Sequence, residues 1–295
     1  MHDQAESLRR KMSTLTLKTE KKPIVRKENR PTQVITITSG KGGVGKSNFA
    51  LNFALSLLEH NKKVLLFDVD VGFANIDLLM GFSPKQTLIH LMEERLSIWE
   101  VIEKGPHGLE MIAGGSGFNR VFQLDEEQMA HFLEQLSELQ GYTDYIILDT
   151  GAGLSPDSLR YIMAADEVIL ITTPEPTSYM DAYAVLKSVH HYDPGLTFKL
   201  IINRCMSVKE GKQTFHTLHS VANQFLKKEI YSLGFIPEDA KVNRAVKAQI
   251  PFVLEYPESK AAKAIREITA TFLNLPLKRV GGVRGFLNKM FHKLG

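Results

Sequence analysis

The most constraining feature of the sequence is a glycine-rich segment, residues 40–47, which reads Gly-Lys-Gly-Gly-Val-Gly-Lys-Ser. A β-branched run that begins at Val34 precedes it, and apolar residues from Phe49 to Leu58 follow it at helical spacing. Glycines between a strand and a helix let backbone N–H groups surround a phosphate, and the helix dipole favours an anion at its N-terminus. The order strand, loop, helix therefore predicts a nucleotide-binding loop.

The residue types within this loop suit a nucleoside triphosphate. Lys46 is expected to reach the β- and γ-phosphates as a catalytic cation, and Ser47 to bind Mg²⁺. Contacts to the nucleotide are expected along the whole loop, at Gly40, Gly42, Gly43, Val44, Gly45, Lys46, Ser47 and Asn48. The alternative is a glycine-rich turn that binds no nucleotide. The flanking strand and helix favour the nucleotide site, so ATP or ADP with Mg²⁺ are the expected cofactors.

The rest of the chain alternates between predicted strands and helices. Further strands are expected at residues 63–68, 109–112, 145–149, 168–172, 198–203 and 230–236. Helices are expected at residues 126–139, 156–165, 179–190, 208–228 and 257–273. The strands are continuous apolar runs, which is typical of a parallel sheet buried on both faces. We therefore predict an α/β fold with a mostly parallel central sheet flanked by helices.

Composition and charge divide the chain into a body and two basic tails. Residues 1–31 contain nine Lys or Arg and four acidic residues, and residues 278–295 contain five and none. The remaining 22 basic and 29 acidic residues make the body acidic. An acidic body disfavours DNA as the principal partner. We expect a flexible basic N-terminal partner segment at 1–31, an ATPase domain at 32–277 and a C-terminal helix at 278–295.

Two further observations concern the cellular compartment. The single cysteine, Cys205, excludes a disulfide framework and any cysteine-ligated cluster assembled within one chain. The sequence contains no run of eighteen apolar residues, and the N-terminal stretch is basic and polar. These features predict a cytoplasmic protein.

Three aspartates follow predicted strands and are candidates for the chemistry of phosphoryl transfer. Asp149 ends an apolar run and precedes Thr-Gly-Ala-Gly, while Asp68 and Asp70 follow the second strand. We expect Asp68 and Asp149, with Ser47, to form the magnesium environment, and Asp70 to position the attacking water. The alternative is that these carboxylates only cap the loops that follow the strands.

A second group of polar residues is expected near the base of the nucleotide. Asn203 closes a strand, and its amide can donate and accept at the same time, as an adenine edge requires. Arg204 follows it, and Pro237, Glu238 and Asp239 follow the last strand and are expected to close the base pocket. The alternative is a structural role, which is the commoner one for an asparagine at a strand end.

Together these motifs resemble the MinD/ParA class of deviant phosphate-loop ATPases over residues 33 to about 275. The extra lysine of the loop, Lys41, carries much of the resemblance, and residues 72–81 are similar to the switch region of MinD. The resemblance implies a three-layer phosphate-loop NTPase fold and a Mg²⁺-dependent ATPase that is activated by dimerisation. It also implies that Lys41 crosses the interface of an ATP-dependent homodimer and acts on the partner's nucleotide as an in-trans cation.

The C-terminal tail has the pattern of a basic amphipathic helix. Its apolar face is expected to contain Phe286, Leu287, Met290, Phe291 and Leu294. Such a helix suits an anionic bilayer surface, and two copies in a dimer would bind better than one. The alternative is a terminal helix that docks on its own domain. We expect the protein to associate reversibly with the inner face of the cell membrane.

The N-terminal residues Asp3, Gln4, Ala5, Leu8 and Arg9 resemble a motif of the FlhG (YlxH) family of MinD-like flagellar number regulators. This resemblance implies a partner-binding segment that activates an FlhF-type GTPase, and contacts with flagellar switch-ring proteins. It favours control of flagellar number, placement and assembly as the function. The alternatives are a ParA-like DNA-partition ATPase, an iron–sulfur carrier and a scaffold that binds nucleotide without turnover.

Overall fold

The first strand of the chain lies in the interior of an eight-stranded sheet, and the glycine-rich loop leaves the sheet at the end of this strand. The computed structural model describes residues 31–70, 76–93, 96–114 and 126–274. The strands lie in the order β3-β4-β2-β5-β1-β6-β7-β8, and only the β3–β4 pair is antiparallel. Their bounds are β1 Gln33–Ser39, β2 Val64–Asp68, β3 Glu103–Lys104, β4 Glu110–Ala113, β5 Tyr145–Asp149, β6 Glu167–Thr172, β7 Phe198–Cys205 and β8 Ile230–Pro237.

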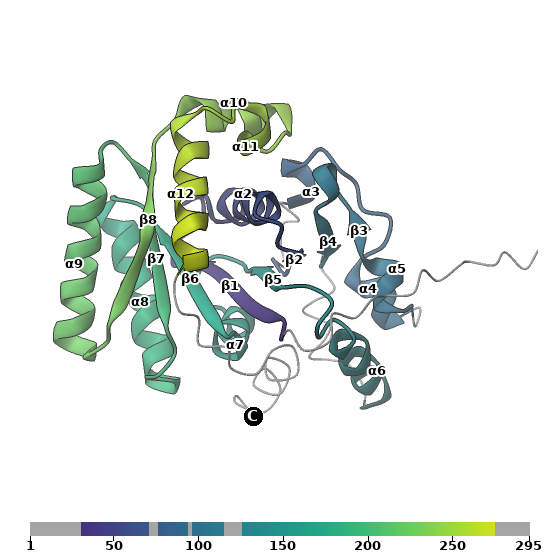
Figure 1. Cartoon of the computed structure of the whole chain (residues 1–295). Coiled ribbons are helices and arrows are strands. Elements are labelled where there is room, and N and C mark those ends of the chain that lie inside the picture. Colours follow the sequence, from purple (N-terminus) through teal and green to yellow (C-terminus); the bar gives the residue numbers. More distant parts are fainter. Residues whose placement is uncertain (1–30, 71–75, 94–95, 115–125, 275–295) are drawn as a thin grey trace, which may run out of the picture.

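Helices connect the parallel strands and cover both faces of the sheet (Figure 1). Their bounds are α2 Lys46–Glu59, α3 Ile76–Leu79, α4 Leu88–Glu93, α5 Ile98–Val101, α6 Glu126–Ser137, α7 Pro156–Ala164, α8 Pro176–Tyr192, α9 Val208–Leu226, α10 Ala240–Ala248, α11 Phe252–Glu255 and α12 Lys260–Asn274. The predicted α/β class is confirmed. The sequence patterns did not predict α3, α4, α5, α10, α11 or the short strand β3.

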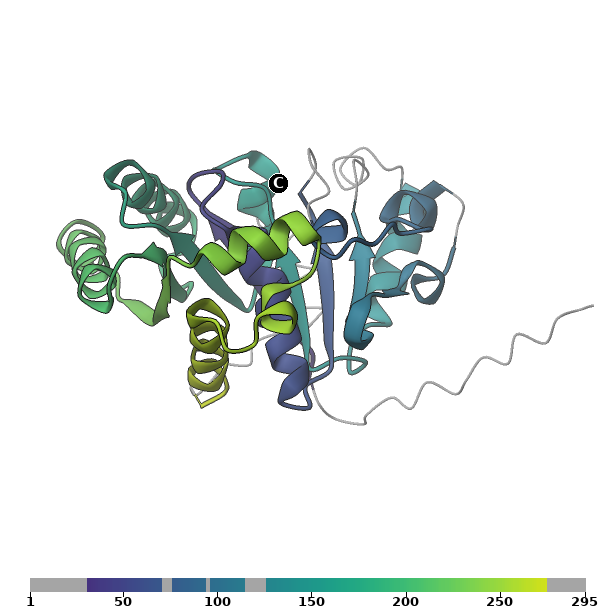
Figure 2. The same cartoon turned by 90° about the horizontal axis from the view of Figure 1, so that it is seen from above.

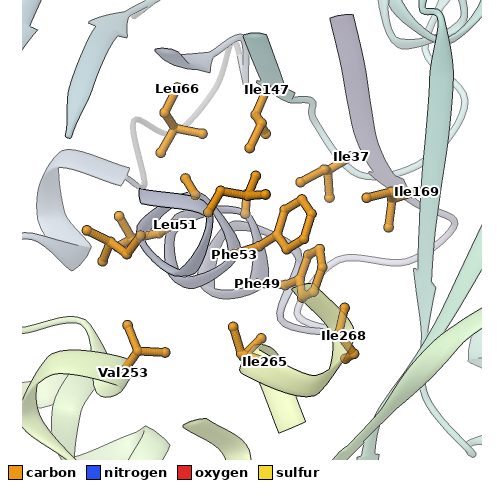
Figure 3. Packing of buried hydrophobic residues seen from close by; sticks show 14 of the residues in the cluster. Ile37, Phe49, Leu51, Phe53, Leu66, Ile147, Ile169, Val253, Ile265 and Ile268 are labelled. Atoms are coloured by element: carbon orange, nitrogen blue, oxygen red, sulfur yellow. The ribbon is translucent and has the colours of Figure 1, made fainter. Parts of the chain in front are cut away.

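Alternate residues of the central strands face two different apolar cores. In β1, Val34 packs with the cluster that α4 to α7 cover, while Ile35 packs with the cluster around α2. In the cluster around α2, Phe49 and Phe53 stack with ring centroids 5.2 Å apart, and residues of the strands and of α12 surround them (Figure 3). Helix α2 is therefore clamped between the sheet and α12, so the loop at its start has a rigid base.

Asn52 links α2 to the C-terminal helices through a polar contact inside this core. Its side chain is fully buried, its Nδ2 donates to the carbonyl of Asn48 at 2.7 Å, and its Oδ1 accepts from the N–H of Val253 at 3.0 Å. A buried N–H group that loses its acceptor costs more than the hydrogen bond itself contributes. Asn52 therefore couples the position of α11 to that of the helix below the glycine-rich loop.

We expect Asn52→Leu to lower the free energy of unfolding by about 1–3 kcal/mol, because the N–H of Val253 loses its acceptor in an apolar setting. Urea denaturation measures the change. The matched control is Asn223→Ala on the exposed face of α9, where the lost contact is a surface bond to Glu229 and the expected change is within about 0.5 kcal/mol. Equal losses in the two variants would contradict this account of Asn52.

Candidate nucleotide-binding site

The glycine-rich loop takes a conformation that depends on its glycines at particular positions. Gly43 and Gly45 have φ values of 77° and 95°, in the left-handed region that disfavours side chains. A Cβ on Gly40 would lie 2.2 Å from the carbonyl carbon of Asp181, because α8 packs directly on the loop. Gly45 is also the N-cap of α2 and offers no side-chain acceptor to the first N–H groups of that helix. These N–H groups are available to an anionic ligand.

Two adjoining cavities open at this loop. The larger, about 630 Å³, is lined by Ser39, Gly42, Gly43, Gly45, Lys46, Ser47, Asn48, Asp70, Leu78, Leu79, Ala152, Arg204 and Val246. The smaller, about 160 Å³, is lined by Gly45, Asn48, Phe49, Asn203, Arg204, Ile236, Pro237, Glu238, Asp239, Val242, Asn243, Val246, Phe252 and Ile265. The larger cavity has the size of a small-ligand site. The loop residues predicted to hold phosphates lie around it, apart from Gly40 and Val44.

A buried ion pair lies at the floor of the loop. The Nζ of Lys46 is 2.6 Å from Oδ1 of Asp149 and 3.3 Å from the hydroxyl of Ser47. Both charged side chains are almost completely buried. Burial raises the pKa of Asp149, and the charge of Lys46 opposes that rise. The predicted loop cation and the predicted strand-end carboxylate are thus in direct contact.

Asp68 lies beside Asp149, because the two residues are register partners on the parallel strands β2 and β5. Its Oδ1 accepts from the N–H of Asp70 at 3.1 Å and its Oδ2 from the N–H of Ile76 at 3.4 Å. Burial, followed by the repulsion of Asp149, raises the pKa of Asp68 to about 7. A cation near these carboxylates would favour their charged forms.

The side-chain oxygens of Asp149, Asp68 and Ser47 form a set of ligands that suits Mg²⁺. Oδ2 of Asp149 is buried and has no hydrogen-bond partner among the residues that the structure describes. Asp68 and Ser47 are the neighbouring oxygen donors, and Mg²⁺ is usually held by one or two carboxylates together with phosphate and water. No group of three His, Cys, Asp or Glu side chains in the described ranges could hold a metal by itself. The geometry therefore suits an ion that arrives with a phosphate ligand.

Asp70 lies at the edge of the larger cavity, next to the loop that follows β5. A Cβ added to Gly151 would lie 3.3 Å from Oδ1 of Asp70, so the two loops approach closely. The assignment of Asp70 to water positioning stays a prediction.

The residues expected near the base lie around the smaller cavity. Asn203 has two internal partners: its Nδ2 donates to the carbonyl of Val44 at 2.7 Å, and its Oδ1 accepts from the N–H of Arg204 at 2.9 Å. A Cβ on Gly45 would lie 2.4 Å from that same Nδ2. The amide of Asn203 therefore supports the loop, and its contact with adenine stays a prediction.

Lys41 lines neither cavity. Its Nζ lies 3.2 Å from Oε2 of Glu175 and 3.0 Å from Oγ1 of Thr177, at the start of α8. The pair is exposed, with 40% of the Lys41 side chain and 64% of the Glu175 side chain accessible, so it contributes at most about 1 kcal/mol. The lysine is therefore held weakly within its own chain.

Sequence reasoning missed the cavity walls that α3, α10, α11 and α12 supply. These are Leu78, Leu79, Val242, Asn243, Val246, Phe252 and Ile265. One signal was available for α10, since Asp239 is a favourable N-cap residue and its Oδ1 accepts from the N–H of Lys241 at 2.9 Å.

Two predicted sites lie outside the described residues. They are the partner segment with Asp3, Gln4, Ala5, Leu8 and Arg9, and the membrane helix with Phe286, Leu287, Met290, Phe291 and Leu294. Residues 72–75 of the switch-like segment lie outside as well. Within the described ranges, no helix has the length and apolar character needed to cross a bilayer.

A parallel sheet, a glycine loop between β1 and α2, and a strand-end aspartate beside the loop lysine together define a P-loop NTPase. The ParA family model, described as an iron-transfer P-loop NTPase of the NUBPL type, matches residues 30–273. The chain belongs to the ParA/MinD family of P-loop NTPases, and it is an ATPase.

Relatives and solved structures agree with this assignment. The chain is 36% identical to the antiactivator FleN of Pseudomonas aeruginosa, over 84% of this chain and 88% of FleN. It is 32% identical to the flagellum site-determining protein YlxH of Helicobacter pylori, over 90% of this chain and 91% of YlxH. Among solved structures, MinD of Pyrococcus horikoshii complexed with Mg-ADP matches with a TM-score of 0.64 and 26% identity, over 82% of this chain and 96% of that chain.

The raised pKa of Asp68 predicts a pH dependence of stability in the nucleotide-free protein. A carboxyl with a pKa of about 7 when folded and 3.8 as its ordinary value binds more protons in the folded state between these values. Its contribution to the free energy of unfolding is therefore fully present below about pH 4 and is lost as the pH rises through 7. Relative to Asp68→Asn, we expect the wild type to lose on the order of 2–4 kcal/mol between about pH 4 and 8.

Urea denaturation of both proteins across that range measures the difference between their stabilities. Parallel pH profiles for the wild type and Asp68→Asn would contradict the burial argument for Asp68.

Proposed function

We propose that this ATPase is an ATP-switched spatial regulator of flagellar number or placement. In this proposal, ATP and Mg²⁺ bring two copies together, the dimer associates with the inner face of the membrane, and hydrolysis releases both contacts. The observation that carries the proposal is the position of Lys41. It belongs to the phosphate loop, yet it lines neither cavity of its own chain and is held by exposed contacts with Glu175 and Thr177.

The surroundings of the loop support a face-to-face dimer. Leu78, next to the larger cavity, is 59% exposed, and Met180 in the first turns of α8 is 54% exposed. Leu154, in the loop after β5, is 39% exposed. Large apolar side chains that are accessible around a charged site are typical of surfaces that become covered by a partner. A second copy would cover them and bring its own Lys41 toward this cavity.

Each residue of the site has a role in this proposal. Bound Mg-ATP supplies the reactive γ-phosphate and a divalent charge that offsets its negative oxygens. Lys46 would turn from Asp149 toward the phosphates, and Asp149 and Ser47, with Asp68 close by, would hold the magnesium shell. Asp70 would orient the attacking water, and the partner's copy of Lys41 would stabilise the charge that develops in the transition state. The smaller cavity, with Arg204, Pro237, Glu238 and Asp239, would take the base.

Measurement of molecular mass by light scattering tests the dimer. We expect a monomer with ADP and a dimer with a non-hydrolysable ATP analogue, and we expect Lys41→Ala to remain monomeric with both and to lose at least about tenfold in ATPase rate. The matched variant is Glu175→Gln, which removes the negative charge beside Lys41 within its own chain and leaves the contact with Thr177. It should still form the dimer, because the exposed pair contributes little.

Loss of the dimer in Glu175→Gln as complete as in Lys41→Ala would mean that Lys41 acts within its own chain. A Lys41→Ala protein that still forms the dimer and hydrolyses ATP at the wild-type rate would refute the proposed switch.

The division into segments 1–31, 32–277 and 278–295 belongs to the proposal as well. The last segment would be the membrane-binding helix, and two weak helices in one dimer would bind through multivalency. We expect the protein with the ATP analogue to sediment with anionic vesicles several-fold more than with ADP. Deletion of residues 278–295 should abolish that difference and leave ATP-dependent dimerisation intact. Equal sedimentation with both nucleotides would contradict the proposed nucleotide-dependent membrane association.

The flagellar assignment rests on two relatives. YlxH of Helicobacter pylori is a flagellum site-determining protein, and FleN of Pseudomonas aeruginosa is an antiactivator. We propose that this chain has a corresponding role, with Asp3, Gln4, Ala5, Leu8 and Arg9 contacting an FlhF-type GTPase, and with flagellar switch-ring proteins as further partners. Binding of purified chain to each of these partners, with and without residues 1–31, tests both interactions.

The alternatives have weaker support. For a DNA-partition ATPase, the acidic charge balance of the body is unfavourable. For iron carriage, Cys205 is the single cysteine of the chain and is buried, and burial raises the pKa of its thiol to about 12. A thiol in this state is a poor metal ligand.

A further inference from the structure

Helix α6 carries a row of acidic side chains on the side that faces away from the core. Glu127, Glu134 and Glu138 are spaced by seven and four residues, so they lie on one side of the helix. Glu127 and Glu134 are exposed and Glu138 is partly exposed, while Phe132 and Leu136 on another side are buried. The helix therefore presents a stripe of carboxylates at the surface.

Helix α5 lies along α6 and adds aromatic surface to this stripe. The N–H of Ile98 donates to Oε1 of Gln135 at 2.9 Å, and Nε1 of Trp99 donates to Oε2 of Glu138 at 2.5 Å. The rings of Trp99 and Tyr142 have centroids 4.7 Å apart, and both side chains are partly exposed. These two rings and the three glutamates of α6 form a surface that we call the α5–α6 face. It combines negative charge with accessible apolar area.

Tyr142 also links this face to a buried carboxylate. Its hydroxyl donates to Oε1 of Glu110 at 2.9 Å. Glu110 is only 8% exposed, and its Oε2 has no hydrogen-bond partner among the residues that the structure describes. On the ring of Tyr142 lies the Nζ of Lys63, 3.2 Å from the ring centroid. Lys63 thus illustrates the kind of group that suits this face, a long cationic side chain over an aromatic ring beside carboxylates.

The N-terminal segment of the same chain joins the body next to this face. Thr32 is fully buried in the loop that follows α6. Its hydroxyl lies 3.1 Å from the carbonyl oxygen of Leu139 and 2.7 Å from that of Thr143, and it accepts from the N–H of Gly141 at 2.8 Å. Residues that precede Thr32 therefore leave the body beside the C-terminal end of α6.

The stretch that precedes Thr32 has the charge and the length to cover the α5–α6 face. Residues 18–31 contain six Lys or Arg and two Glu, and the apolar residues Ile24 and Val25 lie among them. The nine residues 22–30 span up to about 30 Å when extended. Helix α6 has twelve residues and is about 18 Å long. The stretch can therefore reach every glutamate of the stripe.

We propose that the basic stretch 18–30 docks on the α5–α6 face of its own chain. Its cations pair with the glutamates of α6, and Ile24 and Val25 cover the rings of Trp99 and Tyr142. Exposed ion pairs are weak between separate molecules, but a short tether gives an effective concentration in about the millimolar range. The docking goes beyond the proposed function and does not depend on it, because no residue of α5 or α6 lines either cavity.

Other occupants fit this face less well. An anionic bilayer or a nucleic acid would be repelled by the glutamates. The basic C-terminal segment follows α12, and Phe272 near the end of α12 packs on Phe53 of α2 in the other apolar core, with ring centroids 5.2 Å apart. Helix α12 lies apart from α5 and α6 in both views (Figure 1, Figure 2). The N-terminal stretch is thus the basic segment that begins at the face.

Photo-cross-linking of the full chain tests the docking. A benzophenone amino acid replaces Ile24, the protein is irradiated in the presence of ADP, and mass spectrometry identifies the linked peptides. A mixture of unlabelled and isotope-labelled chains separates links within one chain from links between chains. We expect most of the product to be linked within one chain to residues 96–102 or 126–142. The yield should fall at least about threefold in about 0.5 M NaCl, because salt screens exposed charges.

Charge reversals on both sides of the contact make the outcome specific. Glu134→Lys, at an exposed position of the stripe, should lower the yield at least about threefold, since one attraction becomes a repulsion. The matched control is Glu267→Lys at an exposed position of α12, which should leave the yield unchanged. A variant altered only in the docked stretch should lower the yield as well, and it combines Lys21→Glu, Lys22→Glu, Arg26→Glu and Lys27→Glu. Thermal unfolding verifies that each variant is folded.

The proposal is overturned if the links fall on other parts of the body, if they occur only between two chains, or if no link to the body forms. A yield that neither salt nor Glu134→Lys changes overturns it too. Failure of the chain to dimerise with an ATP analogue would overturn the proposed switch and leave this result unaffected, because the cross-linking is done with ADP.

Discussion

The buried pair between Lys46 and Asp149 is the interaction on which the rest of the site depends. A lysine and a carboxylate that are both removed from water cost more free energy to bury than a surface pair, and their mutual attraction offsets that cost only while they stay in contact. The pair joins the start of α2 to the end of β5, so it fixes the loop against the centre of the sheet. A triphosphate with a divalent ion would give each member a new partner of opposite charge. Ligand binding and local stability are therefore coupled at this point.

The shape of the loop is set by contacts with distant parts of the chain. Gly40 is pressed against the backbone of α8, and Gly45 against the side chain of Asn203 at the end of β7. Neither position leaves space for a Cβ, so the glycines serve packing as well as backbone freedom. The two lysines of the loop also take different positions. Lys46 pairs with Asp149 at the floor of the site, whereas Lys41 lies outside the cavities beside Glu175.

Much of the architecture could be predicted, because the predicted strands are continuous apolar runs buried on both faces. The strand-end positions of Asp68 and Asp149 follow from the strands themselves, and their adjacency follows from parallel pairing in register. Helices α10 and α11 could not be predicted in the same way. Helix α10 fully buries only Ala245 among its nine residues, its apolar stripe of Val242, Ala245 and Val246 is short, and α11 has four residues. Their positions depend on packing against α2 and α12, and a local sequence pattern does not specify that packing.

The sequence by itself determined the class of the site, because a glycine loop with Lys46 and Ser47 between a buried strand and a helix has a chemistry that follows from residue types and their order. The tertiary structure decided which side chains are engaged. Asn203 and Asn243 are the same residue type, yet the side chain of Asn203 is held by Val44 and Arg204, while Asn243 lies exposed where α10 borders the smaller cavity. The physical reason is that a hydrogen bond depends on which backbone groups lie within about 3 Å, and these groups come from segments far apart in the chain.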